Sequence, residues 1–396
     1  MRWILGARWV VPVSSPPLKL GRISIEGERI VETKEGGGPA DVDLGNAVVF
    51  PGLVNCHTHL DLSGLAGQCP PTAAFPDWLR RVVKHRRSTG STATEEHIRN
   101  GLEQVLRSGA TLVGDIASQG VSFATLNKAP IWSVVFYELL GLTIERASAA
   151  ENEAQRWLHG HWTATHTRQA LSPHAPYSVR NTLYDAANRL ARKHRLLLAT
   201  HLAESQAEGE LLRRQRGEFV PFLKELGVWD PSGLLRDWQE VVERMTRGGV
   251  RALLIHGNYL ASCDWLPSHC TMVYCPRTHA AFGHGPHPFR DWLDRGIRVA
   301  LGTDSLASNP DLDILEEVRF LARQCPDLDS AELLKMVTLN GAWALGFEHE
   351  TGTLEAGKSA DLAVIELGEE DVDDPYAAIL KTTRPVSRVL WRGQWR

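Results

Sequence analysis

Short apolar runs alternate with longer segments of helical periodicity through the middle of the chain, and this alternation constrains the fold most. One such helical segment carries Ile98, Leu102 and Val105 on a single face. Eight strands alternating with helices predict a parallel (β/α)8 TIM-type barrel, which needs about 250 residues. An open doubly wound sheet is the alternative, but no glycine-rich dinucleotide fingerprint supports it. The eight runs cover residues 47–53, 111–116, 131–137, 169–172, 196–201, 252–256, 272–275 and 297–302.

The two ends of the chain have a different residue pattern from the middle. Residues 8–11 and 22–25 near the start, and 362–365 and 386–391 near the end, are short strand-like runs. Neither end has enough apolar residues for a core of its own. We therefore expect 1–50 and 350–396 to form one composite β-sandwich, with 51–349 as the barrel.

Composition narrows the functional classes. The formal net charge of −4 gives no electrostatic reason to expect nucleic acid or an anionic membrane as partner. No stretch approaches the ~18 apolar residues of a membrane span, and Arg8 interrupts the apolar N-terminal run that a signal peptide would need. The six cysteines form no C-x-x-C pair. These features predict a cytoplasmic protein with reduced thiols that acts on a small molecule.

Polar residues end several predicted strands, at the edge where barrels of this type carry their active sites. His57 and His59 follow the first run, His201 ends the fifth, His256 ends the sixth and Asp304 follows the eighth. With a two-residue period, the first two point to the same side. Imidazoles and a carboxylate gathered in this way predict a site for zinc or a related metal.

Two further residues lie beside this cluster. Glu204 follows His201 by three residues, which lets its carboxylate lean back towards the metal. The alternative is a first-turn glutamate favoured by the helix dipole, but the neighbouring histidine favours a catalytic proton carrier. His174 follows the fourth run.

Missing motifs exclude other hydrolases. There is no His-Glu-x-x-His, no Gly-x-Ser-x-Gly elbow and no P-loop. The sequence Cys275-Pro276-Arg277 has no second cysteine nearby, so it is not the zinc motif of the small cytidine-type deaminases.

Six motifs resemble those of the amidohydrolase superfamily, in its branch of purine-type deaminases and chlorohydrolases. The resemblance covers nearly the whole chain. The motifs are PGLVNCHTH at 51–59, SPHAPY at 172–177, HLAE at 201–204, CPR at 275–277, LGTDS at 301–305 and GTLEAGKSADL at 352–362.

The resemblance implies a role for each polar residue. His57, His59, His201 and Asp304 would hold one divalent metal, zinc in the first instance with iron or manganese as alternatives. His256 would lie beside the attacking water, as a weak ligand or a hydrogen-bond partner. No lysine ends the fourth run, where two-metal members carry a carboxylated lysine, so one metal is expected.

The implied reaction is hydrolytic deamination of an amino-substituted aromatic ring. Asp304 would take the proton of the water while His256 orients it. Glu204 would protonate the ring nitrogen next to the carbon under attack. Asp304 would then pass its proton to the departing ammonia.

Within the branch, the chain resembles the 6-amino-6-deoxyfutalosine deaminases of menaquinone biosynthesis. Because their substrate carries a benzoate carboxylate, a cation is expected in the pocket. Arg80, Arg81 and Arg277 are the predicted carboxylate ligands, and His174 is expected to contact substrate. The same segment after the first run also offers Lys84, Arg86 and Arg87 as candidate cations, and the alternative for each of these residues is a solvated basic face. The resemblance lies in 55–63, 75–79, 107–116, 136–139 and 300–308.

Other functions remain open at this point. The rivals are deaminases of S-adenosylhomocysteine, methylthioadenosine, adenosine or guanine, a triazine-type chlorohydrolase, and a non-catalytic scaffold that has lost its metal. The resemblance also implies a possible homodimer. His279 and His284 flank Phe282 where many relatives carry asparagine, which suggests a distinct pocket. Five other histidines have no chemical context: His161, His166, His194, His269 and His349.

Overall fold

Eight parallel strands form the central sheet of the computed structural model, which describes residues 2–72, 74–160, 166–260, 263–368 and 373–396. His161 therefore lies outside the described residues. In spatial order the strands are β8 (Leu53–Thr58), β9 (Ala110–Ser118), β10 (Trp132–Leu139), β11 (Thr167–Pro173), β12 (Leu198–Leu202), β13 (Ala252–His256), β14 (Cys270–Tyr274) and β15 (Val299–Leu301).

The sheet closes between its first and last strands. The backbone N–H groups of Thr303 and Asp304 both donate to the carbonyl of His57, at 3.1 and 3.0 Å. This confirms the predicted (β/α)8 barrel, with one difference at the first run. Residues 47–51 belong to the sandwich as β7 (Ala47–Pro51), and the barrel begins after Gly52. A Cβ on Gly52 would lie 2.1 Å from Thr111 Oγ1, so only glycine permits this passage between the two units.

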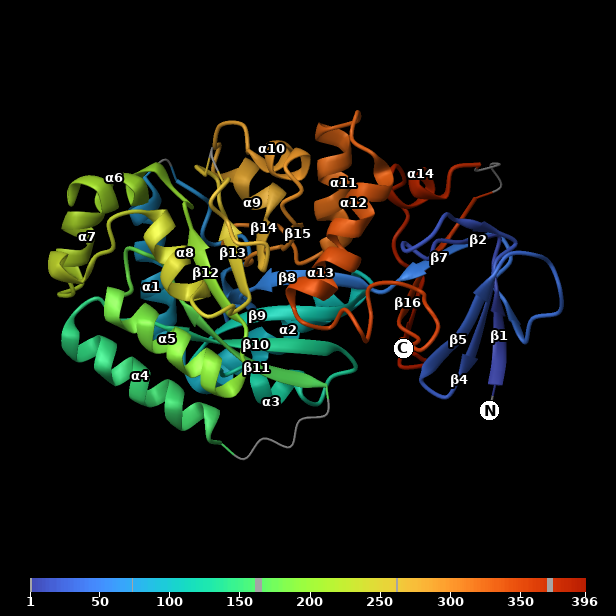
Figure 1. Ribbon diagram of the computed structural model, residues 1–396, viewed down its shortest axis with the longest axis horizontal. Helices are drawn as coiled ribbons and strands as arrows, with labels where there is room; N and C mark the ends of the chain where they lie inside the picture. The colour runs from blue at the N-terminus through green and yellow to red at the C-terminus, as the bar shows by residue number, and fades with distance from the viewer. Residues whose placement is uncertain (1, 73, 161–165, 261–262, 369–372) are drawn as a thin grey trace.

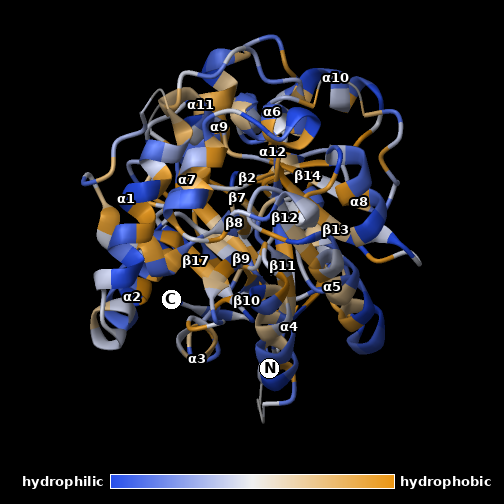
Figure 2. Ribbon diagram, turned by 90° about the vertical axis from the view of Figure 1, so that its left-hand side faces the viewer, coloured by the Kyte–Doolittle hydropathy of each residue, from blue (hydrophilic) through white to orange (hydrophobic). Residues whose placement is uncertain are grey.

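Helices surround the barrel strands, as the end-on view in Figure 2 shows. The described helices include α1 (Phe75–Ser88), α2 (Ser91–Arg107), α3 (Phe123–Leu126), α4 (Ile144–Leu158), α5 (Asn181–His194), α6 (Gln206–Arg214), α7 (Phe219–Glu225) and α8 (Trp238–Thr246). They continue with α9 (Pro276–Ala281), α10 (Phe289–Asp294), α11 (Ile314–Gln324), α12 (Ser330–Met336), α13 (Leu339–Ala344) and α14 (Pro375–Leu380). The short 3-10 helices η1 (Leu60–Leu65) and η2 (Pro231–Gly233) lie in connections.

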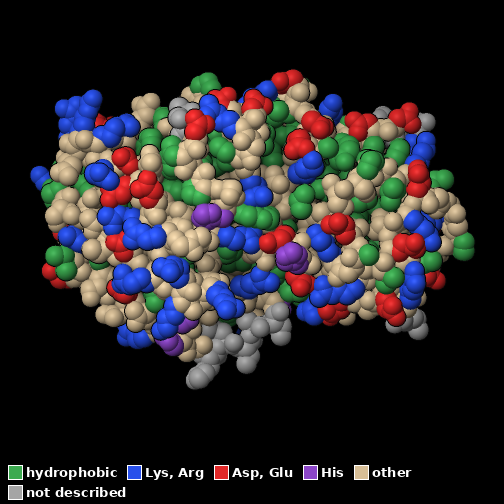
Figure 3. Space-filling view, viewed as in Figure 1, with side chains coloured by type: hydrophobic (Ala, Val, Ile, Leu, Met, Phe, Trp, Pro, Cys, Tyr) green, Lys and Arg blue, Asp and Glu red, His purple; other side chains and the backbone are tan. Residues whose placement is uncertain are grey.

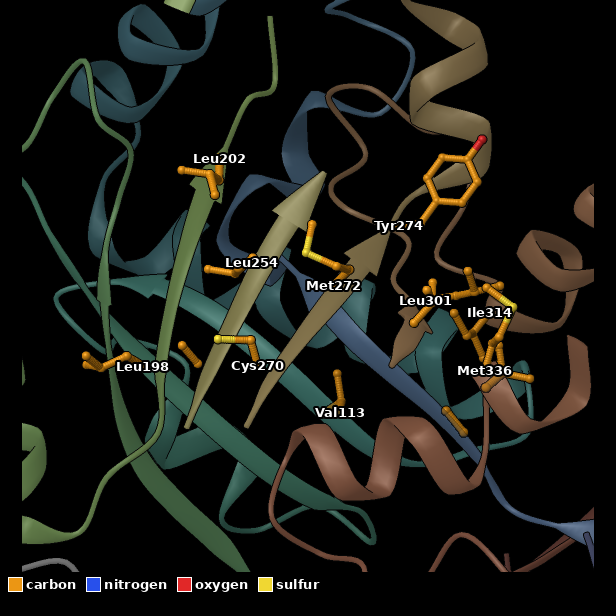
Figure 4. Close-up of a cluster of buried hydrophobic side chains, with 14 of the residues drawn as sticks. Val113, Leu198, Leu202, Leu254, Cys270, Met272, Tyr274, Leu301, Ile314 and Met336 are labelled. Carbon is orange, nitrogen blue, oxygen red and sulfur yellow. The ribbon is translucent and has the colours of Figure 1, made fainter. Parts of the chain in front are cut away.

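Alternation along the strands separates the core from the site. Leu198 and Leu202 of β12 belong to the apolar cluster that Figure 4 shows, where α11 and α12 contribute Ile314 and Met336. Ala199, on the other face of β12, belongs to a separate cluster with Leu253 and Ile255. His201 shares the parity of Ala199, so the strand that packs on the helices also directs a histidine into the barrel.

Both chain ends meet in two further sheets, on the right of Figure 1. One has the order β5 (Arg29–Lys34), β4 (Arg22–Glu26), β1 (Arg2–Gly6), β6 (Val42–Asp43). The other has the order β18 (Gln394–Trp395), β17 (Arg388–Trp391), β16 (Leu362–Glu366), β7, β2 (Trp9–Val10), β3 (Leu18–Lys19). Antiparallel pairing of β16 with β7 joins the two ends. By contrast, α14 lies in the C-terminal segment but places Ile379 and Leu380 in the core cluster of the barrel.

The surface carries charges of both signs (Figure 3), and the cysteines are unpaired. Acidic and basic side chains are interspersed on the face in Figure 3. No disulfide joins the six cysteines, all of which the structure describes. Among the described helices, none is both long and apolar enough to cross a membrane.

Candidate metal centre and active site

Five side chains meet at the carboxyl ends of the barrel strands. His57 lies on β8, His59 follows it, His201 lies on β12, His256 ends β13, and Asp304 follows β15. All five are buried. The Nε2 atoms of His59 and His201 are 3.1 Å apart, and Asp304 Oδ1 lies 3.4 Å from His57 Nε2 and 3.9 Å from His59 Nε2. Candidate ligand atoms of His57, His201 and His256 also lie within 4.8 Å of one another.

The protonation of this cluster suits a divalent cation. Both ring nitrogens of His57 and the Nε2 atom of His256 are buried without a hydrogen-bond partner, which is costly unless another group binds them. His201 Nδ1 lies 2.9 Å from the carbonyl of His174 and must donate to it, which leaves Nε2 as an acceptor. Burial, and then neighbouring histidines, lower the pKa of His59, His201 and His256, so these rings are neutral, as metal ligands must be.

The backbone is strained around the cluster. Ala203, His256 and Asp304 have φ values of 52°, 71° and 58°, in the left-handed region that side chains disfavour. Hydrogen bonds hold two of them: His287 Nε2 donates to the carbonyl of His256 at 2.9 Å, and Ser308 Oγ donates to Asp304 Oδ2 at 2.8 Å. The second bond leaves Asp304 Oδ1 directed at the histidines.

Glu204 lies beside the same cluster. Its Oε1 atom is 3.3 Å from His256 Nε2, and its side chain is buried. Burial, and then the charges of Asp304 and Glu208, raise the pKa of Glu204 well above its usual range. A carboxyl group that keeps its proton at neutral pH can serve as a general acid.

The local structure also excludes the alternative explanation for Glu204, a first-turn glutamate favoured by the helix dipole. Helix α6 begins at Gln206, and Ser205 is its N-cap, whose hydroxyl accepts from the Glu208 N–H at 3.3 Å. Glu204 therefore precedes the cap and does not lie in the first helical turn. The helix-dipole explanation is wrong for this residue, because its side chain faces the cluster instead.

His174 is close to the ligands but is not one of the clustered donors. Its ring centroid lies 5.0 Å from that of His201, and Nδ1 is 2.6 Å from Ser178 Oγ. Its ring forms part of the wall of the cavity in front of the cluster. This position permits the predicted contact with substrate.

The structure does not bring Arg277 to the cavity. Asp311 lies 2.6 Å from its Nη2 atom, and Glu317 lies 2.7 Å from its Nε atom. The guanidinium is thus neutralised by two carboxylates, which corrects the expectation that it binds substrate.

Arg80 and Arg81 also lie elsewhere. Arg80 pairs with Asp77 at 2.5 Å and with Glu225 at 2.7 Å, while Arg81 is exposed and donates to the carbonyl of Pro70. The reason is helical geometry: one face of α1 meets the cavity, and these two residues are on other faces. The cavity face of α1 consists of Trp78, Leu79, Val82 and Arg86.

Sequence reasoning named Arg86 as one candidate cation of this segment but missed the two carboxylates that pair with it. Arg86 Nη1 donates to Glu138 Oε2 at 2.7 Å, and Arg86 Nη2 lies 3.3 Å from Asp61 Oδ2. Glu138 lies near the end of β10, and Asp61 lies two residues after His59. Both carboxylates thus lie at or shortly after a strand end, and this position was the sequence signal that could have identified them.

The cavity in front of the cluster is small, with a volume of about 40 Å³. A larger pocket of about 890 Å³ lies beside it. Phe75 and Phe282 line the larger pocket, and both rings contact Trp78 of the inner cavity, at centroid distances of 5.5 and 5.2 Å.

The two histidines around Phe282 are not among the clustered candidate ligands. His284 lines the larger pocket, and its Nδ1 atom is 2.9 Å from the Tyr259 hydroxyl. His279 is buried, with its ring centroid 5.6 Å from that of Tyr274. The predicted distinct pocket therefore has His284 on its wall but not His279.

Comparison with known proteins identifies similar sequences and structures. The model of the "Amidohydrolase family" matches residues 48–396. An aminodeoxyfutalosine deaminase from a Nitratiruptor species is 28% identical over 362 residues, covering 88% of this chain and 87% of that protein. A 5-methylthioadenosine/S-adenosylhomocysteine deaminase from Pyrococcus abyssi is 28% identical over 391 residues, covering 91% and 85%. The crystal structure of Helicobacter pylori aminofutalosine deaminase with methylthio-coformycin matches with a TM-score of 0.86 and 25% identity, over 100% of both chains.

Proposed function

Because the chain belongs to the amidohydrolase family of metal-dependent hydrolases, we propose that it deaminates an aminated purine nucleoside. The substrate that we propose is 6-amino-6-deoxyfutalosine, which water converts to futalosine and ammonia, a step of menaquinone biosynthesis. The observation that carries the proposal is the buried Glu204 carboxyl group at 3.3 Å from His256, beside the cluster of candidate ligands.

The metal site would consist of His57, His59, His201 and Asp304, with zinc as the proposed ion. The buried nitrogens without partners and the neutral imidazoles fit such a cation. When bound, a divalent metal of this kind lowers the pKa of water from 15.7 towards ~7 and so supplies a nucleophile at neutral pH.

The side chains of the protein then move the protons. His256 orients the attacking water, and Asp304 takes its proton. Glu204 gives its own proton to the ring nitrogen next to the amino-bearing carbon, which makes that carbon a better electrophile. As the C–N bond breaks, Asp304 passes its proton to the leaving ammonia. The remaining hydroxyl proton returns to Glu204 as the oxygen of the water becomes the carbonyl oxygen of the product, so that atoms and charges balance and both carboxyl groups regain their starting states.

Similarity to deaminases supports this choice of reaction. The relatives compared above include an aminodeoxyfutalosine deaminase and a 5-methylthioadenosine/S-adenosylhomocysteine deaminase. A protonated carboxyl group suits a ring nitrogen that must be protonated before ammonia leaves. All proposed ligands are present and buried together, which argues against a scaffold that has lost its metal. His174 is proposed to contact the substrate.

The test is an assay of the zinc-loaded protein on a substrate panel. Ammonia release and the adenine-to-hypoxanthine absorbance change are followed on 6-amino-6-deoxyfutalosine, S-adenosylhomocysteine, 5′-methylthioadenosine, adenosine and guanine. We expect the first to react with kcat/KM in the range ~10⁴–10⁸ M⁻¹s⁻¹. Faster turnover of another member would keep the reaction and replace the substrate. No ammonia from any of them, with zinc bound, would overturn the proposal.

A further inference from the structure

A second pocket lies at the amino ends of the barrel strands, opposite to the metal cluster. Its volume is about 450 Å³. Arg168 is the second residue of β11, and Arg251 comes directly before β13, whereas His256 of the metal cluster ends β13. We call it the basic pocket, because four arginines line it: Arg168, Arg192, Arg195 and Arg251.

The wall of the basic pocket carries no carboxylate to balance these guanidinium groups. None of the described residues that line it is Asp or Glu. Glu348 pairs with Arg251 at 2.9 Å from outside the lining. In the part of the chain that the structure describes, Arg192 and Arg195 form no ion pair. A hollow lined by charges of one sign attracts ligands of the opposite sign.

Aromatic rings fix the orientation of two of the guanidinium groups. Arg168 stacks on Phe347 at 3.7 Å from the ring centroid, and Arg251 stacks on Trp343 at 3.9 Å. Arg168 Nη1 also donates to the carbonyl of Gly346 at 2.5 Å. The Nε atom of Arg251 is buried without a hydrogen-bond partner. A guanidinium that is already oriented loses little conformational freedom when it binds an anion.

The end of α5 brings the other two arginines to the pocket. Arg192 lies in the last turn of α5, and Arg195 is the C-cap residue, with a φ of 56° in the left-handed region where helices commonly carry glycine. A Cβ on Gly248, in the turn before β13, would lie 2.8 Å from Arg192 Nε. Basic residues at this end also favour the helix dipole, but the dipole does not account for Arg168 and Arg251, which line the same hollow from other elements.

The size and the remaining walls define the kind of anion. A phosphate group offers three acceptor oxygens and up to two negative charges, so it suits several guanidinium groups better than a single carboxylate does. The volume leaves space beyond a phosphate group and is within the range of ~300–1,000 Å³ that is typical of small-molecule sites. Leu196, Leu197 and Val250 supply an apolar wall. This wall suits an uncharged body that is attached to the phosphate.

We propose that the basic pocket binds a phosphorylated small molecule of about the size of a nucleotide, with its phosphate oxygens accepting from the four arginines. The pocket is at the other end of the barrel from the metal cluster, so this ligand is not the substrate of the reaction. Its binding joins α5 to β11 and to the start of β13, and it therefore stabilises the folded barrel. The inference does not depend on the proposed deamination.

The test measures the binding of ADP to the zinc-loaded protein by isothermal titration calorimetry. We expect one ADP per chain, with an affinity that falls as NaCl is raised from ~50 to ~500 mM. Arg192→Gln should weaken binding by at least ~10-fold, because hydrogen bonds to a charged group are lost. The matched control is Arg189→Gln, which removes the same charge from α5 but from a side chain that pairs with Glu151 of α4. It should bind ADP as the unmodified protein does.

Citrate, an anion without phosphate, separates phosphate recognition from a general attraction of anions. We expect citrate to bind at least ~10-fold more weakly than ADP. ADP should also raise the Tm of the unmodified protein more than that of Arg192→Gln, because a ligand of the folded state stabilises it.

Four outcomes would overturn the inference. They are no binding of ADP to the unmodified protein, equal binding to Arg192→Gln, an equal loss in Arg189→Gln, and binding of citrate as tight as that of ADP. Equal binding to Arg192→Gln would place ADP elsewhere, for example at the metal cluster. Arg192 is exposed, so its replacement should leave the fold intact, as far-UV circular dichroism can verify. Arg195→Gln repeats the test at the second unpaired arginine and should show the same loss.

Discussion

Burial decides which protons the individual side chains of the site can hold. The imidazoles of His59, His201 and His256 are neutral because the surrounding protein disfavours the charged form. The same effect raises the pKa of Glu204 well above its usual range, which favours its protonated form. One environment thus prepares bases to bind a cation and an acid to donate a proton.

Glu204→Gln tests the proton donor. An amide keeps the shape and polarity of the side chain but cannot deliver the proton, so we expect turnover to fall by at least ~10²-fold. Bound zinc, measured by elemental analysis, should remain stoichiometric because Glu204 is not a proposed ligand. Glu210→Gln on α6 is the control and should keep its activity. A near-normal rate in Glu204→Gln would remove Glu204 from the mechanism.

Glu208 predicts a dependence of stability on pH. Its Oε1 atom accepts from the Ala203 N–H and from Trp238 Nε1, both at 2.7 Å, while burial raises its pKa to about 7 from 4.5. Because the folded state holds the proton more tightly, the stabilising contribution is complete below pH 4.5 and is lost as the pH rises through 7. The protein should therefore lose stability relative to Glu208→Gln between pH 5 and pH 7.5. Urea unfolding of both proteins at these two pH values measures the change in the free energy of unfolding. An equal change in the two proteins would contradict the prediction.

At the scale of elements, the junction of β8 and β15 carries the site. A Cβ on Gly302 would lie 2.7 Å from His57 Cβ and 3.0 Å from the backbone N and O of His57. The two strands approach this closely because they close the barrel, and the same junction places Asp304 next to His57.

Gly302→Ala tests this close approach. The added methyl group forces the strands apart, and we expect a loss of about 1–3 kcal/mol in the free energy of unfolding together with weaker zinc binding. Chemical denaturation and zinc titration measure the two effects. Gly38→Ala is the matched control, since its Cβ would meet nothing within 4 Å. Unchanged stability and zinc affinity in Gly302→Ala would show that the junction is looser than described.

At the scale of the whole molecule, the proposed ligands tie distant parts of the barrel together. They come from β8, β12 and the segment after β15, which are separated along the chain by more than a hundred residues. A cation bound by all of them stabilises only the folded arrangement.

Chelation of the metal should therefore lower the thermal stability as well as the activity. We expect the Tm to fall by at least ~5 °C when zinc is removed, and to recover when it is restored. Differential scanning calorimetry with elemental analysis measures both. The Tm of His57→Ala should not respond to the chelator, because its site is already broken. Complete loss of zinc without a change in Tm would contradict a stabilising site.

The sequence alone determined the barrel and the candidate metal cluster, because both follow from local order. The periodicity of strands and helices is a property of the sequence, and parallel strands have their carboxyl ends at the same edge of the sheet. Hence the positions of His57, His201 and Asp304 at strand ends were enough to group them, and the structure places them together.

Only the tertiary structure decided which charged residues face the cavity. The side of α1 that meets the barrel depends on packing, so Arg86 lines the cavity while Arg80 and Arg81 do not. Arg277 is neutralised by Asp311 and Glu317, carboxylates 34 and 40 residues further along the chain. Contacts between residues that are far apart in the sequence decide which charged side chains face the cavity. No local sequence pattern predicts such contacts.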